Sequence, residues 1–147
     1  MKKIILGLTM LMAIGVTSAF ANEDLKVSEK VLSSFGKDFT FAKNVQWREE
    51  GDYLKARFTI ADMLTEAYYT KDGEFVGSAR NLLFAQLPLS VIHEFNKNYK
   101  EESVLSILEI TNAEGTSYRI WLEKDNRKIK LNATSFGEVT VLEKSKK

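Results

Sequence analysis

One stretch of strictly alternating residues constrains the fold of this chain more than any other feature. In residues 53–60 the apolar side chains occupy every second position, and the remaining positions carry Tyr, Lys, Arg and Thr; the apolar set is Leu54, Ala56, Phe58 and Ile60. Successive side chains of a strand point to opposite faces, so this pattern predicts a strand with one buried and one wet side. Turn signals at Ala61-Asp62 and Lys71-Asp72-Gly73 extend the prediction to three antiparallel strands over residues 51–76.

The first 21 residues have the pattern of an export signal. Lys2 and Lys3 precede an apolar run over residues 4–16, and Ala19-Phe20-Ala21 matches a small-x-small cleavage site. The run is shorter than the roughly 20 apolar residues that a membrane-spanning helix needs. We therefore predict a signal peptide over residues 1–21, cleaved after Ala21. The mature chain is predicted to be periplasmic or secreted, with no insertion into the membrane.

Composition excludes several classes of function. The chain has no cysteine, which rules out disulfides, thiolate nucleophiles and thiolate metal sites. Its 21 Lys and Arg residues nearly match its 20 Asp and Glu residues. A nucleic-acid partner would require a strongly basic face, so no nucleic-acid binding is expected.

Two apolar stripes at helical spacing predict two helices, over residues 25–35 and from about residue 89 to residue 99. The stripes are Val27, Val31 and Phe35 in the first and Val91, Phe95 and Tyr99 in the second. Gly36 is expected to end the first helix, since glycine is favoured just after a helix end. Four predicted strands follow each helix. We therefore predict an α+β fold, with residues 22–147 as a single domain of two repeats, at about 22–80 and 87–147. Each repeat would be a helix plus a four-stranded antiparallel sheet, with both helices on one sheet face and the other face open and concave.

A set of aromatic and turn motifs gives the chain a family resemblance. The motifs, in order, are Val45-x-Trp47, Gly51-x-Tyr53, Ala67-x-Tyr69, Asp72-Gly73-Glu74, Leu87-Pro88 and a final Gly137. Across the mature chain they resemble the PepSY-like proteins whose fold is similar to β-lactamase inhibitory protein (BLIP), which are small exported proteins of Bacteroidetes-type bacteria. The resemblance implies a helix-backed sheet with a concave exposed face, which the inhibitory namesake uses to bind a protein enzyme. It implies no catalytic residue.

The polar side of the alternation supplies the candidate binding residues. They are Tyr53, Lys55 and Arg57 in the first half and Arg119, Trp121 and Glu123 in the second. Trp, Tyr and Arg dominate binding hot spots, so this surface is predicted to contact a partner. The alternatives are a solvated strand face, or a register displaced by one residue that would turn Trp121 inward. Trp47 is expected in the core beneath the first helix.

These observations predict a non-catalytic exported protein that binds a protein or peptide through its open sheet face. A narrower form of the hypothesis is an inhibitor of an envelope hydrolase. The alternatives are a structural envelope protein, an enzyme or a metal-binding protein. His93 is the only histidine and lies on the polar side of the second helix, and the chain has no Gly-x-Ser-x-Gly or His-Glu-x-x-His motif. We therefore expect no enzyme, no cofactor and no metal site.

Overall fold

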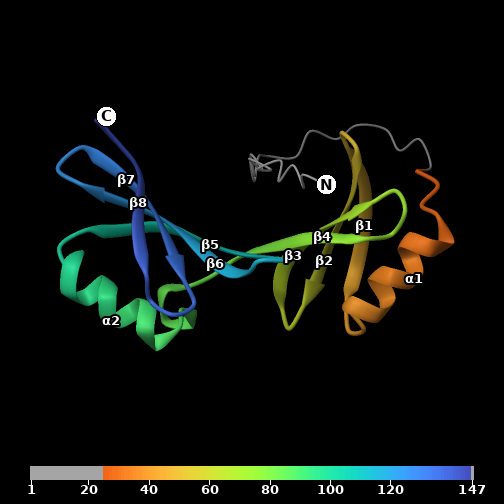
Figure 1. Cartoon of the computed structure of the whole chain (residues 1–147), viewed down its shortest axis with the longest axis horizontal. Helices are drawn as coiled ribbons and strands as arrows, with labels where there is room; N and C mark the ends of the chain where they lie inside the picture. The colour runs from red at the N-terminus through yellow and green to blue at the C-terminus, as the bar shows by residue number, and fades with distance from the viewer. Residues whose placement is uncertain (1–24, 147) are drawn as a thin grey trace, which may run out of the picture.

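A computed structural model describes residues 25–146 and shows one eight-stranded antiparallel sheet, with the strands paired in sequence order (Figure 1). The predicted signal peptide and its cleavage site lie outside the described residues and stay predictions. The strands are β1 (Lys43–Glu50), β2 (Tyr53–Ile60), β3 (Met63–Thr70), β4 (Phe75–Asn81), β5 (Ser103–Asn112), β6 (Gly115–Lys124), β7 (Arg127–Thr134) and β8 (Val139–Lys146). The helices are α1 (Glu29–Asp38), the short η1 (Phe84–Gln86) and α2 (Leu89–Asn98).

The predicted fold class, an α+β arrangement of tandem helix-plus-four-stranded repeats, is wrong. Residues 77–81 of β4 pair with residues 108–112 of β5, so the eight strands form one continuous sheet that dominates the fold. Two separate four-stranded sheets would leave unpaired backbone N–H and C=O groups along the edges of β4 and β5. Joining those edges satisfies the groups. Periodicity within a segment reports which side of a strand is buried, but not which strand edges meet.

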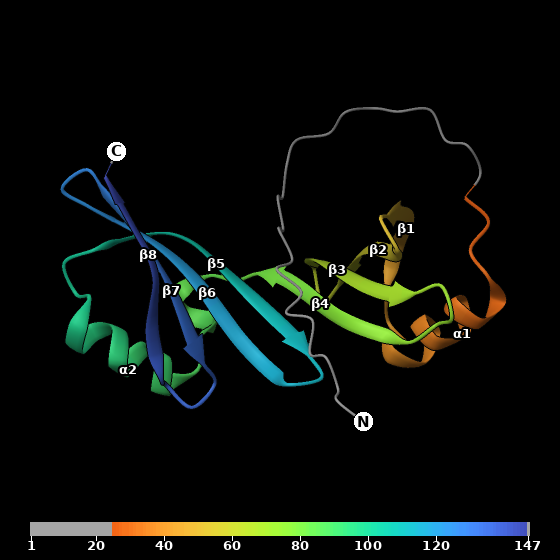
Figure 2. The same ribbon diagram turned by 45° about the horizontal axis from the view of Figure 1, so that its top comes forward.

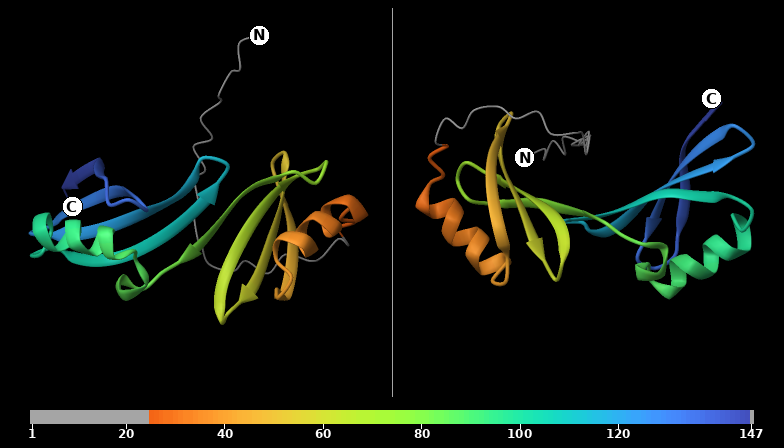
Figure 3. Two further views of the ribbon diagram at one scale, coloured as in Figure 1. Left: turned by 60° about the horizontal axis from the view of Figure 1, so that its bottom comes forward. Right: turned by 180° about the vertical axis from the view of Figure 1, so that it is seen from behind.

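Both helices pack on the same face of this sheet. α1 buries Val31 and Phe35 in one apolar cluster, and α2 buries Val91 and Phe95 in another. The helices lie toward opposite ends of the molecule (Figure 2), and the sheet bends so that both are on its outer side (Figure 3). Among residues 25–146, no helix therefore lies on the inner side of the bend.

An aromatic cluster fixes α1 on the sheet. The ring of Phe35 lies 5.0 Å from that of Phe58 and 5.3 Å from that of Trp47, measured between centroids. The expected core position of Trp47 beneath the first helix is confirmed. The expectation that Gly36 ends this helix is wrong, because α1 continues to Asp38 and the N–H of Phe39 still bonds to the carbonyl of Phe35 at 2.9 Å. The ring centroids of Phe39 and Phe58 also lie 4.7 Å apart. This packing outweighs the roughly 1 kcal/mol that a glycine such as Gly36 costs inside a helix.

Two-residue turns set the register of the two long hairpins. Ala61 and Asp62 connect β2 to β3, and Asp125 and Asn126 connect β6 to β7; all four residues have positive φ. Positive φ at both central positions is the geometry of the type I′ turn, whose twist matches that of antiparallel strands. Within residues 25–146, no helix combines the length and the apolar character needed to cross a membrane.

Candidate binding surface

The six predicted binding residues, three on β2 and three on β6, project to the inner side of the sheet, which we call the helix-free face. Its members in β2 and β3 include Tyr53, Lys55, Arg57, Glu66 and Tyr68, and its members in β5, β6 and β7 include Leu108, Arg119, Trp121, Glu123, Lys128, Lys130 and Asn132. Directly paired residues of an antiparallel sheet project to the same side. The register links each half of this set, and the alternate residues, such as Ala56 and Ile120, are buried in the helix-side clusters.

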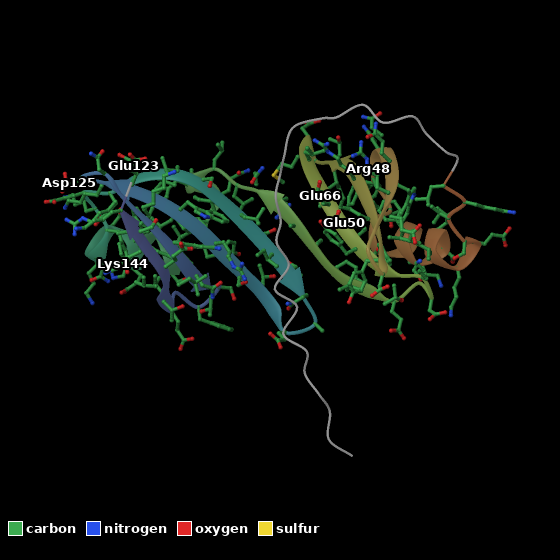
Figure 4. All side chains as sticks on the ribbon, turned by 90° about the horizontal axis from the view of Figure 1, so that it is seen from above. Arg48, Glu50, Glu66, Glu123, Asp125 and Lys144 are labelled. Carbon is green, nitrogen blue, oxygen red and sulfur yellow. The ribbon has the colours of Figure 1, made fainter. Side chains whose placement is uncertain are left out.

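Charged side chains occur in both halves of the helix-free face. Figure 4 shows the molecule from above, with Glu50 and Glu66 in one half and Glu123 in the other. All six predicted residues are partly buried. The surface therefore combines aromatic and charged side chains, and both kinds are partly removed from water.

Tyr68 and Lys55 form the centre of the first half. The Lys55 ammonium lies 5.8 Å from the centroid of the Tyr68 ring and pairs with the carboxylate of Glu50. The Tyr68 hydroxyl donates a 3.5 Å hydrogen bond to Oε2 of Glu66. Burial raises the pKa of Tyr68 well above its ordinary value, and the negative charges of Glu66 and Glu50 add to the shift. The phenol therefore stays protonated and remains a hydrogen-bond donor.

Trp121 and Lys130 form a similar pair in the second half. The two residues are directly opposite each other in β6 and β7, and the Lys130 ammonium lies 5.6 Å from the centroid of the Trp121 ring. Arg119 lies two positions before Trp121 on the same face, and its Nε is buried with no hydrogen-bond partner in the described part of the chain. A lysine over an aromatic ring thus occurs in each half of the helix-free face, with an energetic contribution of about 0.5–1 kcal/mol at exposed sites.

The sequence prediction left the side of Tyr68 open and did not name Lys130 as a member of the site. A signal for both residues was present in the turns. Counting outward from Ala61-Asp62 pairs Tyr68 with Lys55, and counting outward from Asp125-Asn126 pairs Lys130 with Trp121. A two-residue turn fixes hairpin register in this way. Tyr69 consequently points to the other side, beneath α1.

Solved structures share this arrangement of strands and helices. A BLIP-like protein from Bacteroides fragilis NCTC 9343 matches with a TM-score of 0.72 at 18% identity, over 83% of this chain and 87% of that one. A DUF2874 family protein from Bacteroides ovatus ATCC 8483 matches with a TM-score of 0.69 at 21% identity, over 82% and 88%. The chain has the BLIP-like fold. The resemblance is therefore confirmed at the level of the BLIP-like fold, and its PepSY part stays a prediction.

A third protein with this BLIP-like fold, from Bacteroides eggerthii DSM 20697, is described as periplasmic. It matches with a TM-score of 0.67 at 20% identity, over 82% of this chain and 89% of that one. At these identities the likeness shows the fold alone. No family model matches the sequence, and no curated protein does.

Within this BLIP-like fold the remaining polar features lie outside the helix-free face or at its rim. His93 is exposed on α2, on the helix side of the sheet. Among residues 25–146, no group of three or more His, Asp or Glu side chains has the geometry to hold a metal ion. A shallow hollow of about 500 Å³ lies beside Glu123; its lining is Glu101, Ser103, Leu105, Glu123, Lys124, Asp125 and Asn126. Lys124 pairs with Glu101 there, and this hydrogen bond lowers the pKa of the Glu101 carboxyl.

Proposed function

We propose that this chain is a non-catalytic protein of the periplasm or the extracellular space, and that it binds a protein partner through the helix-free face. The observation that carries the proposal is that Lys55, Arg119 and Trp121, from strands distant in sequence, project to the same side of the sheet, on which no helix of residues 25–146 packs. The predicted signal peptide and a structural neighbour described as periplasmic support the location. The BLIP-like fold supports the choice of a binding protein over an enzyme.

The order of the side chains on the helix-free face favours a binding role over a face that only contacts solvent. Lys55 and Lys130 each rest over an aromatic ring, so both members of each pair are partly ordered before any partner arrives. Ordering rotamer-rich side chains in advance reduces the entropy lost on association, by about 0.5–1.5 kcal/mol per side chain. Residues on strands are also held more precisely than residues on loops. The helix-free face is therefore preorganised for contact.

A capture experiment on native envelope extract tests the proposal. The exported protein and its Trp121→Ala and Arg57→Ala variants would be used as bait, with Leu89→Ala as the matched control. Leu89 is 83% exposed at the start of α2, on the helix side of the sheet. We expect the same partner on the wild type and on Leu89→Ala, and its loss from Trp121→Ala. Equal recovery by all four proteins would contradict the proposal.

Inhibition of an envelope hydrolase is a narrower function that the same face could perform, and it stays a prediction. Titration of envelope peptidases and β-lactamases with the wild type and with Trp121→Ala would check it. Loss of activity with the wild type but not with the variant would support inhibition. Full activity at a micromolar excess of the wild type would contradict inhibition while leaving the binding proposal in place.

A further inference from the structure

We propose that the protein partner presents an acidic segment to the helix-free face, and that Arg119 receives a carboxylate of this segment. This inference rests on the proposed function and assigns the chemistry of its partner. It places the carboxylate between Leu108 and Asn132, which are directly opposite Arg119 in β5 and β7, with Trp121 two positions further along β6.

The first argument is the distribution of charge on this face. Four of its basic residues have an acidic residue paired with them or directly opposite; these combinations are Lys55 with Glu50, Arg57 with Glu66, Lys128 with Glu123 and Lys130 with Glu143. Arg119 differs, because its direct neighbours across β5 and β7 are Leu108 and Asn132. Among the basic residues that β2, β6 and β7 place on this face, Arg119 is thus the one with neither an ion pair nor a directly opposed acid within residues 25–146. A positive charge at such a position favours a partner that carries a negative charge opposite it.

The second argument is the hydrogen-bonding state of Arg119. Its Nε is buried and donates to no acceptor in the described part of the chain, while the side chain as a whole is partly exposed. A guanidinium cannot lose its proton in a protein and offers only donors. A carboxylate is the group whose geometry fits this planar fork, through two parallel N–H···O bonds. Since Arg119 is partly exposed, a carboxylate of the partner would bind its guanidinium from the solvent side.

The third argument separates a peptide from other anions. Trp121 is partly exposed beside Arg119 on the same face, so an apolar side chain next to the carboxylate would also find a contact. An anionic membrane or a nucleic acid would be attracted by clustered basic residues instead. The acidic residues Glu50, Glu66 and Glu123 on the same face oppose such an extended negative surface. The surroundings of Arg119 therefore favour an acidic peptide segment.

Selection from a random peptide library displayed on phage tests the inference on the exported protein. We expect peptides selected on the wild type to be enriched in Asp and Glu. For the tightest peptide, replacing its acidic residue by the matching amide should weaken binding to the wild type on the order of tenfold or more. Arg119→Gln should weaken binding by a similar factor, and Arg119→Lys should weaken it less. The matched control, Lys97→Gln, removes one positive charge from α2 and should bind as the wild type does.

Three outcomes would overturn the inference. Selected peptides without acidic residues, whose binding is lost on Trp121→Ala, would refute the carboxylate assignment while the proposed function stands. Unchanged binding of an acidic peptide to Arg119→Gln would refute the role of Arg119. Failure of the wild type to select any peptide would count against both the inference and the proposed function. The amide-substituted peptide is measured on the wild type, so this arm does not depend on the folding of any variant.

Discussion

The hydroxyl of Tyr69 donates a 2.8 Å hydrogen bond to Oδ2 of Asp38, which joins β3 to the C-terminal end of α1. Tyr69 is fully buried, so this bond gives its hydroxyl an acceptor that the apolar cluster around it does not provide. Tyr69→Phe should lower the free energy of unfolding by about 1 kcal/mol, the usual net contribution of such a bond. Urea denaturation would measure the change.

The control for this prediction is Tyr99→Phe. The Tyr99 hydroxyl has no hydrogen bond within residues 25–146, so its removal should change stability by no more than a few tenths of a kcal/mol. Equal losses in both variants would contradict the role of the Tyr69–Asp38 bond. Because Tyr69 lies on the helix side of the sheet, partner binding should be the same in the wild type and in Tyr69→Phe.

Alkaline pH should destabilise the protein through its buried tyrosines. Burial is the largest cause that raises the pKa above the ordinary value of 10.0 for four of them, namely Tyr68, Tyr69, Tyr99 and Tyr118. Above pH 10.0 these tyrosines ionise in the unfolded chain but keep their protons in the folded one, so the folded state binds more protons and stability falls as pH rises. Urea denaturation at pH values below and above 10.0 measures the effect. The decline should be shallower in Tyr69→Phe, and stability that stays constant or rises through this range would contradict the prediction.

The aromatic cluster under α1 should be a major source of stability. Phe35→Ala removes the ring that contacts Phe58 and Trp47, and should cost about 3–5 kcal/mol. Leu32 lies on the same helix but is 45% exposed, so Leu32→Ala is the matched control and should cost less than about 1 kcal/mol. Thermal denaturation followed by circular dichroism would compare them. Similar losses in the two variants would show that α1 does not pack through Phe35.

Continuity of the sheet across β4 and β5 can be tested with two glycines. A Cβ added at Gly77 would lie 2.9 Å from the carbonyl oxygen of Thr111 on β5, so Gly77→Ala should destabilise the protein by about 1–3 kcal/mol. The same change at Gly36, inside α1, meets no atom within 4 Å and should stabilise by about 0.5–1 kcal/mol. Urea denaturation would measure both changes, and the free energy of unfolding should fall in Gly77→Ala and rise in Gly36→Ala. A harmless Gly77→Ala would argue that β4 and β5 do not pair as described.

Local patterns in the sequence predicted the elements more successfully than their assembly. The alternation of Leu54, Ala56 and Phe58 identified the buried side of β2. The alternation in β6 predicted that Trp121 projects to the polar side, where the register of the folded sheet also has it. The pairing of β4 with β5 could not be predicted in this way, because α2 separates the two strands in sequence and no periodicity reports contact between strand edges. The prediction that the first helix ends at Gly36 failed for a related reason. Packing of Phe39 on Phe58, which the local sequence does not report, extends the helix beyond this glycine.

The residues of the candidate site could be predicted from the sequence only where the register of a hairpin could be predicted. Tyr53, Lys55 and Arg57 follow from alternation within a single strand. The cation–aromatic pairs need the pairing of two strands, which the turns at Ala61-Asp62 and Asp125-Asn126 determine. The isolation of the Arg119 charge depends on three strands at once, β5, β6 and β7, and therefore becomes visible only in the folded sheet.

Site-specific photo-crosslinking in the native cell tests the central claim, that a partner binds the helix-free face, most directly. A photoreactive residue at Asn132, directly opposite Arg119, would report on the helix-free face, and one at Leu89 would report on the helix side. The account predicts a defined protein adduct from position 132 that is lost when Trp121→Ala is added, and none from position 89. An adduct from position 89 with none from position 132 would contradict it.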